Sequence, residues 1–433
     1  MGAADAAGTP FGKVPGSALS RRDFALLWSA MLVTATGNTA MQTIIPPVGR
    51  SLGVDDFWMA LAFTTSAVAW VVLAPIWARR SDSHGRKSLI LIGLVGFITS
   101  TLGCAVALQA GLEGWVGVLP AMLGFAVVRA VYGLLGCATP AGTQAYLAAR
   151  TRRSSRTVAL SGLTAAFGLG TVIGPALVPA FALPGLELIG PLYVFAALGV
   201  ATWVVVWRRL PDDRARVRRA RSAAMGFPSA SPTGASVRAA TSAAPSGRLR
   251  WHDRRVRDWL VAGAITNTSM AGLLTVVGFY TIDVLGLDPA RSLDEVGIVL
   301  MGGAIASLVA QWGVIPRSGW APRQLIIVGA MVGIVGIVVV MLAASLYGLV
   351  LGYGIACLGF GLTRPGFASG ASLAVPLAEQ GAVAGLTTSV NGFAFIFAPT
   401  GTLLLYHAAP WLAFTVLIAL LALSLALFGR TRG

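Results

Sequence analysis

Charged residues are scarce in this sequence. Only 11% of its 433 residues are Asp, Glu, Lys or Arg, whereas 56% are hydrophobic and the mean hydropathy is +0.78. A soluble domain usually keeps about a quarter of its residues charged, so this composition excludes an ordinary water-soluble enzyme or binding domain. Uncharged runs of about 20 residues, the length that crosses a bilayer, fill most of the chain instead.

These runs predict twelve membrane spans. The stretch 114–149 predicts one span because only Arg129 interrupts it, and the runs 324–363 and 380–429 each predict two, with breaks near 345–347 and 406–410. The other seven runs predict one span each: 24–49, 57–78, 88–112, 157–186, 188–207, 259–282 and 296–316. The sequence therefore predicts an all-α polytopic membrane protein.

Acidic residues are absent from the middle of every predicted span. All 16 Asp and Glu residues, and all three His residues, fall in loops or near span ends. Intramembrane enzymes need an embedded nucleophile or metal site, so we predict that the protein is not an enzyme. The three Cys residues show no disulfide or metal-ligand spacing, and we predict no metal and no other cofactor.

Basic residues gather on one side of the predicted spans. Of 32 Lys and Arg residues, 28 fall on the side of the amino terminus, and only Arg50 and Arg291 fall on the other. This positive-inside bias predicts that both termini are cytoplasmic, and it explains the net charge of +16 without nucleic-acid binding. Abundant Ala, Gly and Arg favour a bacterial protein, and hence a multi-pass protein of the cytoplasmic (inner) membrane.

A polar, basic segment divides the spans into six and six. It covers 209–257, is rich in Arg, Ala, Ser and Pro, and predicts a disordered cytoplasmic linker. The predicted order is a cytoplasmic tail at 1–22, a six-helix bundle at 23–208, the linker, a second six-helix bundle at 258–429 and a short cytoplasmic tail at 430–433.

The two halves repeat each other in sequence. Asn38-Thr-Ala-Met in the first span matches Asn267-Thr-Ser-Met in the seventh. Leu-Gly-Phe-x-x-x-Arg ends at Arg129 in the fourth span and at Arg364 in the tenth. Repeated six-helix halves are typical of transporters that work by alternating access, with a binding site near the bilayer midplane.

The loop after the second span carries a family signature. Its residues Asp82-Ser-His-Gly85-Arg86-Lys87 resemble the signature loop of the major facilitator superfamily, although Ala78 and a serine replace two of its usual residues. The resemblance implies a major facilitator fold of twelve helices in two pseudo-symmetric six-helix bundles. It also implies that this loop helps to hold the outward-facing state.

A second motif resembles one branch of that superfamily. Gly170-Thr-Val-Ile-Gly174-Pro175 is similar to the Gly-x-x-x-Gly-Pro motif of the drug:proton antiporters. Small residues four apart allow helices to approach closely, and proline bends a helix by removing a backbone donor. The resemblance implies a conformational role for these residues and points towards export.

The resemblance also places Arg129 and Arg364 on helices that face a central cavity, which the first, fourth, seventh and tenth helices line. An arginine keeps its proton, and at the bilayer centre it costs about 2.5–3.5 kcal/mol. Because no acid lies at that depth, we expect both arginines to bind an anionic group through charge-assisted hydrogen bonds. The other predicted substrate-binding residues are Asn38, Gln42, Tyr132, Asn267, Asn391 and Trp70.

The predicted function is therefore secondary active transport. We expect a monomer in the lipid bilayer that exports a partly apolar anionic or zwitterionic small molecule, driven by a proton or substrate gradient. Three alternatives stay open: a proton-coupled multidrug efflux pump for lipophilic cationic or neutral drugs, an uptake permease or lipid flippase, and, from another class, a membrane-embedded enzyme.

Overall fold

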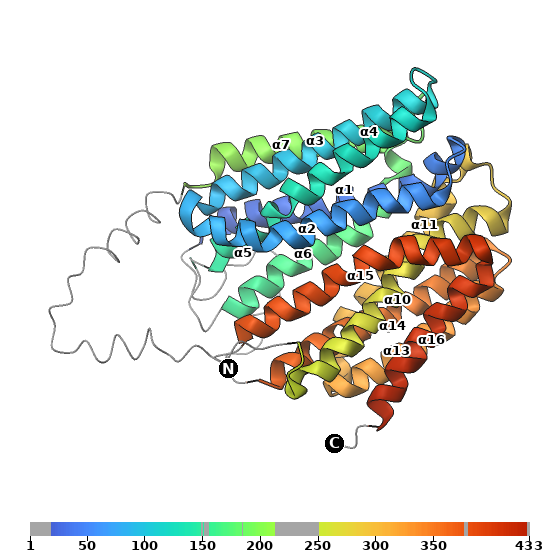
Figure 1. Ribbon diagram of the computed structural model, residues 1–433. Helices are drawn as coiled ribbons and strands as arrows, with labels where there is room; N and C mark the ends of the chain where they lie inside the picture. The colour runs from blue at the N-terminus through green and yellow to red at the C-terminus, as the bar shows by residue number, and fades with distance from the viewer. Residues whose placement is uncertain are drawn as a thin grey trace. The chain divides into compact units, whose positions relative to one another are not determined.

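A computed structural model describes residues 19–148, 150, 156–183, 185–212, 251–375 and 380–430, and these residues are almost entirely helical (Figure 1). The helices of the first half are α1 (Arg21–Ser51), α2 (Asp56–His84), α3 (Arg86–Leu112), α4 (Val118–Val131), α5 (Ala138–Ala148), α6 (Arg156–Leu177) and α7 (Gly190–Arg209). Those of the second half are α10 (Arg254–Leu285), α11 (Leu293–Leu308), α12 (Ile315–Ser318), α13 (Pro322–Leu342), α14 (Leu346–Leu373), α15 (Gln380–Ala408) and α16 (Pro410–Arg430).

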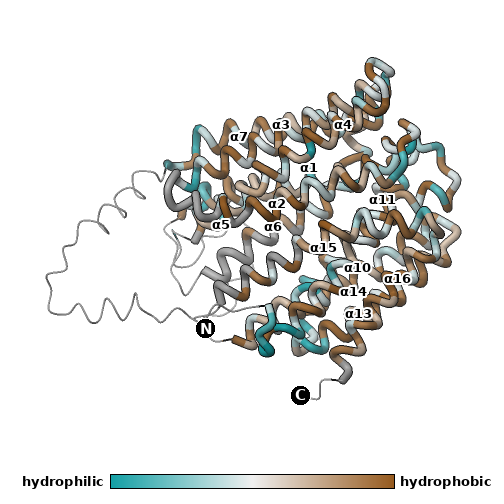
Figure 2. Tube along the Cα trace, viewed as in Figure 1, coloured by the Kyte–Doolittle hydropathy of each residue, from teal (hydrophilic) through white to brown (hydrophobic). Residues whose placement is uncertain are grey.

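The helices follow the predicted spans. A π-helical turn joins α4 to α5 and another joins α11 to α12, so each of these pairs forms one span. Within the described residues, ten helices are long and apolar enough to cross a membrane, and α6 and α15 run over the remaining two predicted spans. Figure 2 shows apolar residues along the helices and polar ones gathered near their ends.

Both predicted breaks inside the long uncharged runs are confirmed. Helix α13 ends at Leu342 and α14 begins at Leu346, while α15 ends at Ala408 and α16 begins at Pro410. Most of the predicted linker at 209–257 and of the two predicted tails lies outside the described residues.

The chain forms two compact units. The first contains α1 to α7 together with Thr275–Ala304, which is the end of α10 and most of α11. The second contains the earlier part of α10, up to Leu274, and the helical segments from Ile305–Ala343 and from Tyr347 onward. Helix α10 therefore contributes to both units.

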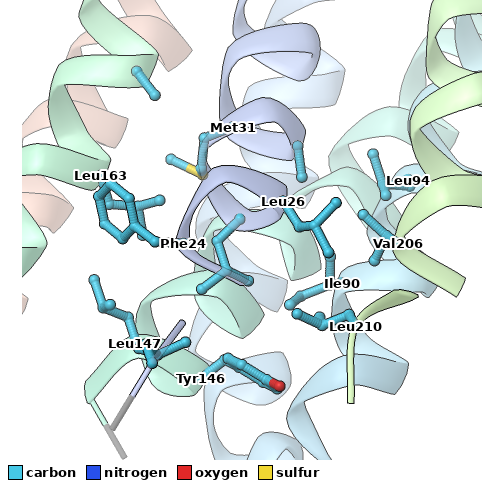
Figure 3. Packing of buried hydrophobic residues seen from close by; sticks show 14 residues of the cluster. Phe24, Leu26, Met31, Ile90, Leu94, Tyr146, Leu147, Leu163, Val206 and Leu210 are labelled. Carbon is cyan, nitrogen blue, oxygen red and sulfur yellow. The ribbon is translucent and has the colours of Figure 1, made fainter. Parts of the chain in front are cut away.

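The core of the first unit is apolar where five of its helices converge. Figure 3 shows side chains from α1, α3, α5, α6 and α7 pointing toward one another. The Tyr146 hydroxyl donates a hydrogen bond of 3.0 Å to the backbone oxygen of Pro211, which satisfies the one polar atom of this buried ring. The cluster includes Phe24, Leu27, Met31, Ile90, Leu94, Tyr146, Leu147, Leu163 and Val206.

Small residues bring α1 and α6 into close contact, as the Gly-x-x-x-Gly-Pro motif predicts. A Cβ added at Gly170 would lie 2.6 Å from the Cβ of Ala35, and one added at Gly174 would lie 2.1 Å from Oγ1 of Thr39. The Thr39 hydroxyl donates a hydrogen bond of 3.2 Å to the backbone oxygen of Gly170. Pro175 lies inside the same helix.

Basic side chains cap the carboxyl-terminal ends of two helices in the same way. Lys87, in the first turn of α3, donates from Nζ to the backbone oxygen of Trp207 near the end of α7, at 2.8 Å. Arg323, in the first turn of α13, donates from Nε and Nη2 to the backbone oxygen of Phe428 near the end of α16, at 3.1 and 2.6 Å. A cation satisfies carbonyl groups that the end of a helix leaves without partners.

Candidate functional site

Arg129 lies in α4, just before the π-helical turn Tyr132–Gly136. The turn lies against α2, because a Cβ added at Gly133 would be only 2.2 Å from the backbone oxygen of Ser66. Such turns inside helices are frequent at functional sites. Glycine is thus required where this turn packs against the backbone of α2.

Arg129 is buried without a carboxylate partner among the described residues. Its side chain is 5% exposed, and Nη2 donates a hydrogen bond of 2.7 Å to Oδ1 of Asn38 on α1. Its Cζ lies 4.5 Å from the ring centroid of Phe63 and 4.8 Å from that of Tyr132. The guanidinium is therefore held by an amide and two aromatic rings, which stabilise a cation without cancelling its charge.

The Nε of Arg129 has no hydrogen-bond partner although it is buried. An unpaired donor of this kind costs about 1–3 kcal/mol, and more on a charged group. The site therefore has an unused donor next to the one that binds Asn38. A carboxylate is suited to accept from two neighbouring nitrogens of a guanidinium.

Aromatic rings extend the site away from Arg129. The ring of Tyr132 lies 5.4 Å from that of Trp70 on α2 and 6.3 Å from that of Phe97 on α3, measured between centroids. The structure thus brings together four of the predicted residues: Asn38, Trp70, Arg129 and Tyr132. Gln42 is half-buried one turn further along α1.

Phe63 and Phe97 also belong to this site, and the sequence does not predict either of them. Phe63 lies seven residues before Trp70 on α2, a spacing that places both on one helix face. This spacing is a signal that could have identified Phe63. Nothing in the sequence marks Phe97 in the same way, because its proximity to Tyr132 depends on how α3 packs.

Arg364 lies in α14, in the second unit, and its side chain is exposed. It makes no hydrogen bond or ion pair within the described part of the chain. Leu351 and Leu373, at 60% and 76%, are the most exposed leucines of α14. At 100° per residue, Arg364 points roughly 140° and 180° away from these leucines. The accessible guanidinium therefore lies on the other side of the helix from its most exposed leucines.

The other predicted substrate-binding residues are less informative. Asn267 is 3% exposed on α10. The side chain of Asn391 lies outside the described ones, so the part it takes in the site stays a prediction.

The predicted signature loop is partly described. The Asp82 side chain lies outside the described ones, whereas Gly85 has φ of +89°, a conformation that favours glycine, as the tight turn requires. Arg86 is half-buried at the start of α3, and Lys87 caps α7 as described above. The conformational role of this loop, and of Gly170, Gly174 and Pro175, stays a prediction.

The chain is similar to a large family of membrane transporters. The family model for the Major Facilitator Superfamily matches residues 27–399. The gallate transporter of Pseudomonas putida is 27% identical over 379 residues, which cover 79% of this chain and 78% of that protein.

Other curated relatives match over shorter stretches. The staphyloferrin B transporter of Staphylococcus aureus is 27% identical over 160 residues, or 36% of this chain and 35% of that protein. The multidrug resistance protein MdtG of Yersinia enterocolitica is 25% identical over 198 residues, or 45% and 44%. The chain thus matches less than half the length of each of these two relatives.

Solved structures share the fold at low sequence identity. The D-xylose-proton symporter superposes with a TM-score of 0.70 at 13% identity, over 95% of this chain and 98% of that one. The human organic anion transporter MFSD10 gives a TM-score of 0.64 at 17% identity, over 94% and 99%.

Proposed function

Since the chain belongs to the major facilitator superfamily, and is therefore a multi-pass membrane transporter of small molecules rather than an enzyme, we propose that it exports a partly apolar anionic or zwitterionic compound. Transport is secondary active and proceeds by alternating access through a central cavity lined by α1, α4, α10 and α14. The protein works as a monomer in a bacterial inner membrane, with both termini cytoplasmic and the bundles 23–208 and 258–429 as its two domains.

The observation that carries this proposal is the state of Arg364. It is accessible, it has no partner within the described residues, and it points away from the exposed leucines of its helix. An arginine in a membrane helix is costly unless it is paired, hydrated or bound to an anion. Arg129 supports the same conclusion, because its partners leave its charge uncancelled.

The relatives support both parts of the proposal. One is named for gallate, a carboxylate, and a structural neighbour is called an organic anion transporter. MdtG is named for multidrug resistance, which favours export.

A multidrug pump for lipophilic cationic or neutral compounds is the second candidate. The rings of Phe63, Trp70, Phe97 and Tyr132 favour it, since aromatic surface binds apolar compounds of either charge. The sign of the ligand's charge separates the two candidates.

Thermal stabilisation of the purified protein tests this proposal. We expect lipophilic carboxylates to raise the melting temperature and matched lipophilic cations not to do so. Arg364→Gln is expected to weaken carboxylate binding by about tenfold to a hundredfold, because a charge-assisted hydrogen bond contributes about 1.5–3 kcal/mol.

Arg317→Gln is the control, since Arg317 is an exposed arginine that donates to the backbone oxygen of Gly313 in its own helical segment. It is expected to leave carboxylate binding unchanged. Stabilisation by cations that persists in Arg364→Gln would contradict the anion proposal and support the multidrug pump.

A further inference from the structure

Arg50 binds two carboxylates at once. It lies in the last turn of α1, and its Nε and Nη2 donate to Oδ1 and Oδ2 of Asp56 at 2.8 and 2.6 Å. Its Nη1 and Nη2 also donate to Oδ1 and Oδ2 of Asp283 at 2.8 and 3.1 Å. One guanidinium therefore joins the ends of three helices, α1, α2 and α10, all within the first unit.

The two carboxylates differ in how firmly they are held. Asp56 is 1% exposed in the first turn of α2 and lies only six residues from Arg50. Asp283 is 37% exposed near the end of α10 and lies 233 residues away. Removing one partner of a buried pair is strongly unfavourable, whereas an exposed pair contributes little and separates easily. The contact with Asp56 is thus the harder of the two to break, and the contact with Asp283 is the one that can be released.

Apolar residues next to Arg50 also pack between α1 and α10. Pro46 lies one turn before Arg50, and its Cγ would be 2.7 Å from a Cβ added at Gly278. The ring centroid of Phe279 lies 5.8 Å from the Cζ of Arg50. Polar and apolar contacts near the end of α1 therefore both hold the end of α10 against it.

Helix α10 contributes to both units, because its residues up to Leu274 belong to the second and those from Thr275 onward belong to the first. A contact that holds its last turns against α1 and α2 limits how far these turns can move.

We propose that the Arg50–Asp283 pair is a releasable latch that must open during transport, and that Asp56 is a positioning residue that holds Arg50 in reach of Asp283. The latch closes the side of the membrane at which α1 ends and α2 begins. Its role is independent of the chemical class of the substrate, so it does not depend on the anion proposal.

Cysteine labelling tests the latch without a substrate. Pro46→Cys puts a thiol against Gly278, and its reaction with a membrane-impermeant maleimide is measured in lipid nanodiscs. We expect Asp283→Asn and Arg50→Gln each to speed this reaction by about fivefold, which converts to ~1 kcal/mol, the upper range for a partly exposed pair. Protein without the introduced cysteine gives the background from the three native cysteines.

The double variant separates positioning from general support of the fold. Asp56→Asn is expected to speed labelling by a similar factor, and Asp56→Asn with Asp283→Asn to be no faster than Asp283→Asn alone, because both act through one pair. If Asp56 only stabilised the fold, the two effects would add.

Arg291→Gln is the matched control, since Arg291 is the other arginine between spans on that side. It is expected to leave the labelling rate unchanged. The latch is refuted if Asp283→Asn, with an unchanged melting temperature, labels no faster than the parent, or if Arg291→Gln speeds labelling equally.

Discussion

Gly174→Val is expected to destabilise the protein by about 3 kcal/mol, at the upper end of the cost of overpacking a close-packed interior. The added Cβ would lie 2.1 Å from Oγ1 of Thr39 and 2.6 Å from the backbone oxygen of Thr36. Because the second of these atoms is backbone, α1 and α6 must separate to make room. That separation also stretches the hydrogen bond from Thr39 to Gly170, which is 3.2 Å long.

The measurement is the melting temperature in detergent, together with the yield of monodisperse protein. Gly401→Val is the control, because Gly401 is also a helical glycine close to a proline, but a Cβ there meets no atom within 4 Å. Both variants carry the helix penalty of a β-branched side chain, so the difference between them reports the helix contact. Equal losses would show that α1 and α6 do not pack as described.

Asn38→Asp is expected to change stability and ligand binding in opposite directions. Asp has nearly the shape of Asn, so its carboxylate can take the place of Oδ1, which accepts from Nη2 of Arg129 at 2.7 Å. The new ion pair stabilises the protein because it gives a buried cation a counter-charge. It also cancels the positive charge of Arg129, and we expect the affinity for lipophilic carboxylates to fall by about a hundredfold, ~2.7 kcal/mol.

Melting temperatures with and without ligand measure both effects in one experiment. Asn38→Leu is the companion variant, which removes the acceptor without adding charge and is expected to lower the melting temperature of the free protein. Unchanged carboxylate binding in Asn38→Asp would place the substrate away from Arg129, whatever happens to the stability.

The fold follows from the sequence because each span is a local property. A run of about 20 uncharged residues must either cross a membrane or be buried, and no partner elsewhere in the chain is needed to recognise it. The breaks after Leu342 and Ala408 could be predicted for the same reason, since polar and turn-forming residues interrupt the apolar run there.

The site follows only in part, because it depends on which helices meet. Arg129 and Asn38 are conspicuous as polar residues in apolar spans, yet the bond between them joins residues 91 positions apart. Phe97 looks like any core residue until α3 packs beside Tyr132. Asp283 lies at a helix end, where an acid is unremarkable in sequence, and its pairing with Arg50 depends on tertiary structure.

The two basic helix caps show what kind of likeness the halves share. Lys87 and Arg323 stand at the start of the third helix of their halves, and each binds the backbone near the end of the sixth. The residue differs, but the bond is the same. Backbone oxygen accepts from either cation, so a substitution between them can pass without loss of the contact. In this chain, a comparison of hydrogen bonds therefore identifies Lys87 and Arg323 as equivalent residues of the two halves. A comparison of residue types alone misses this pair.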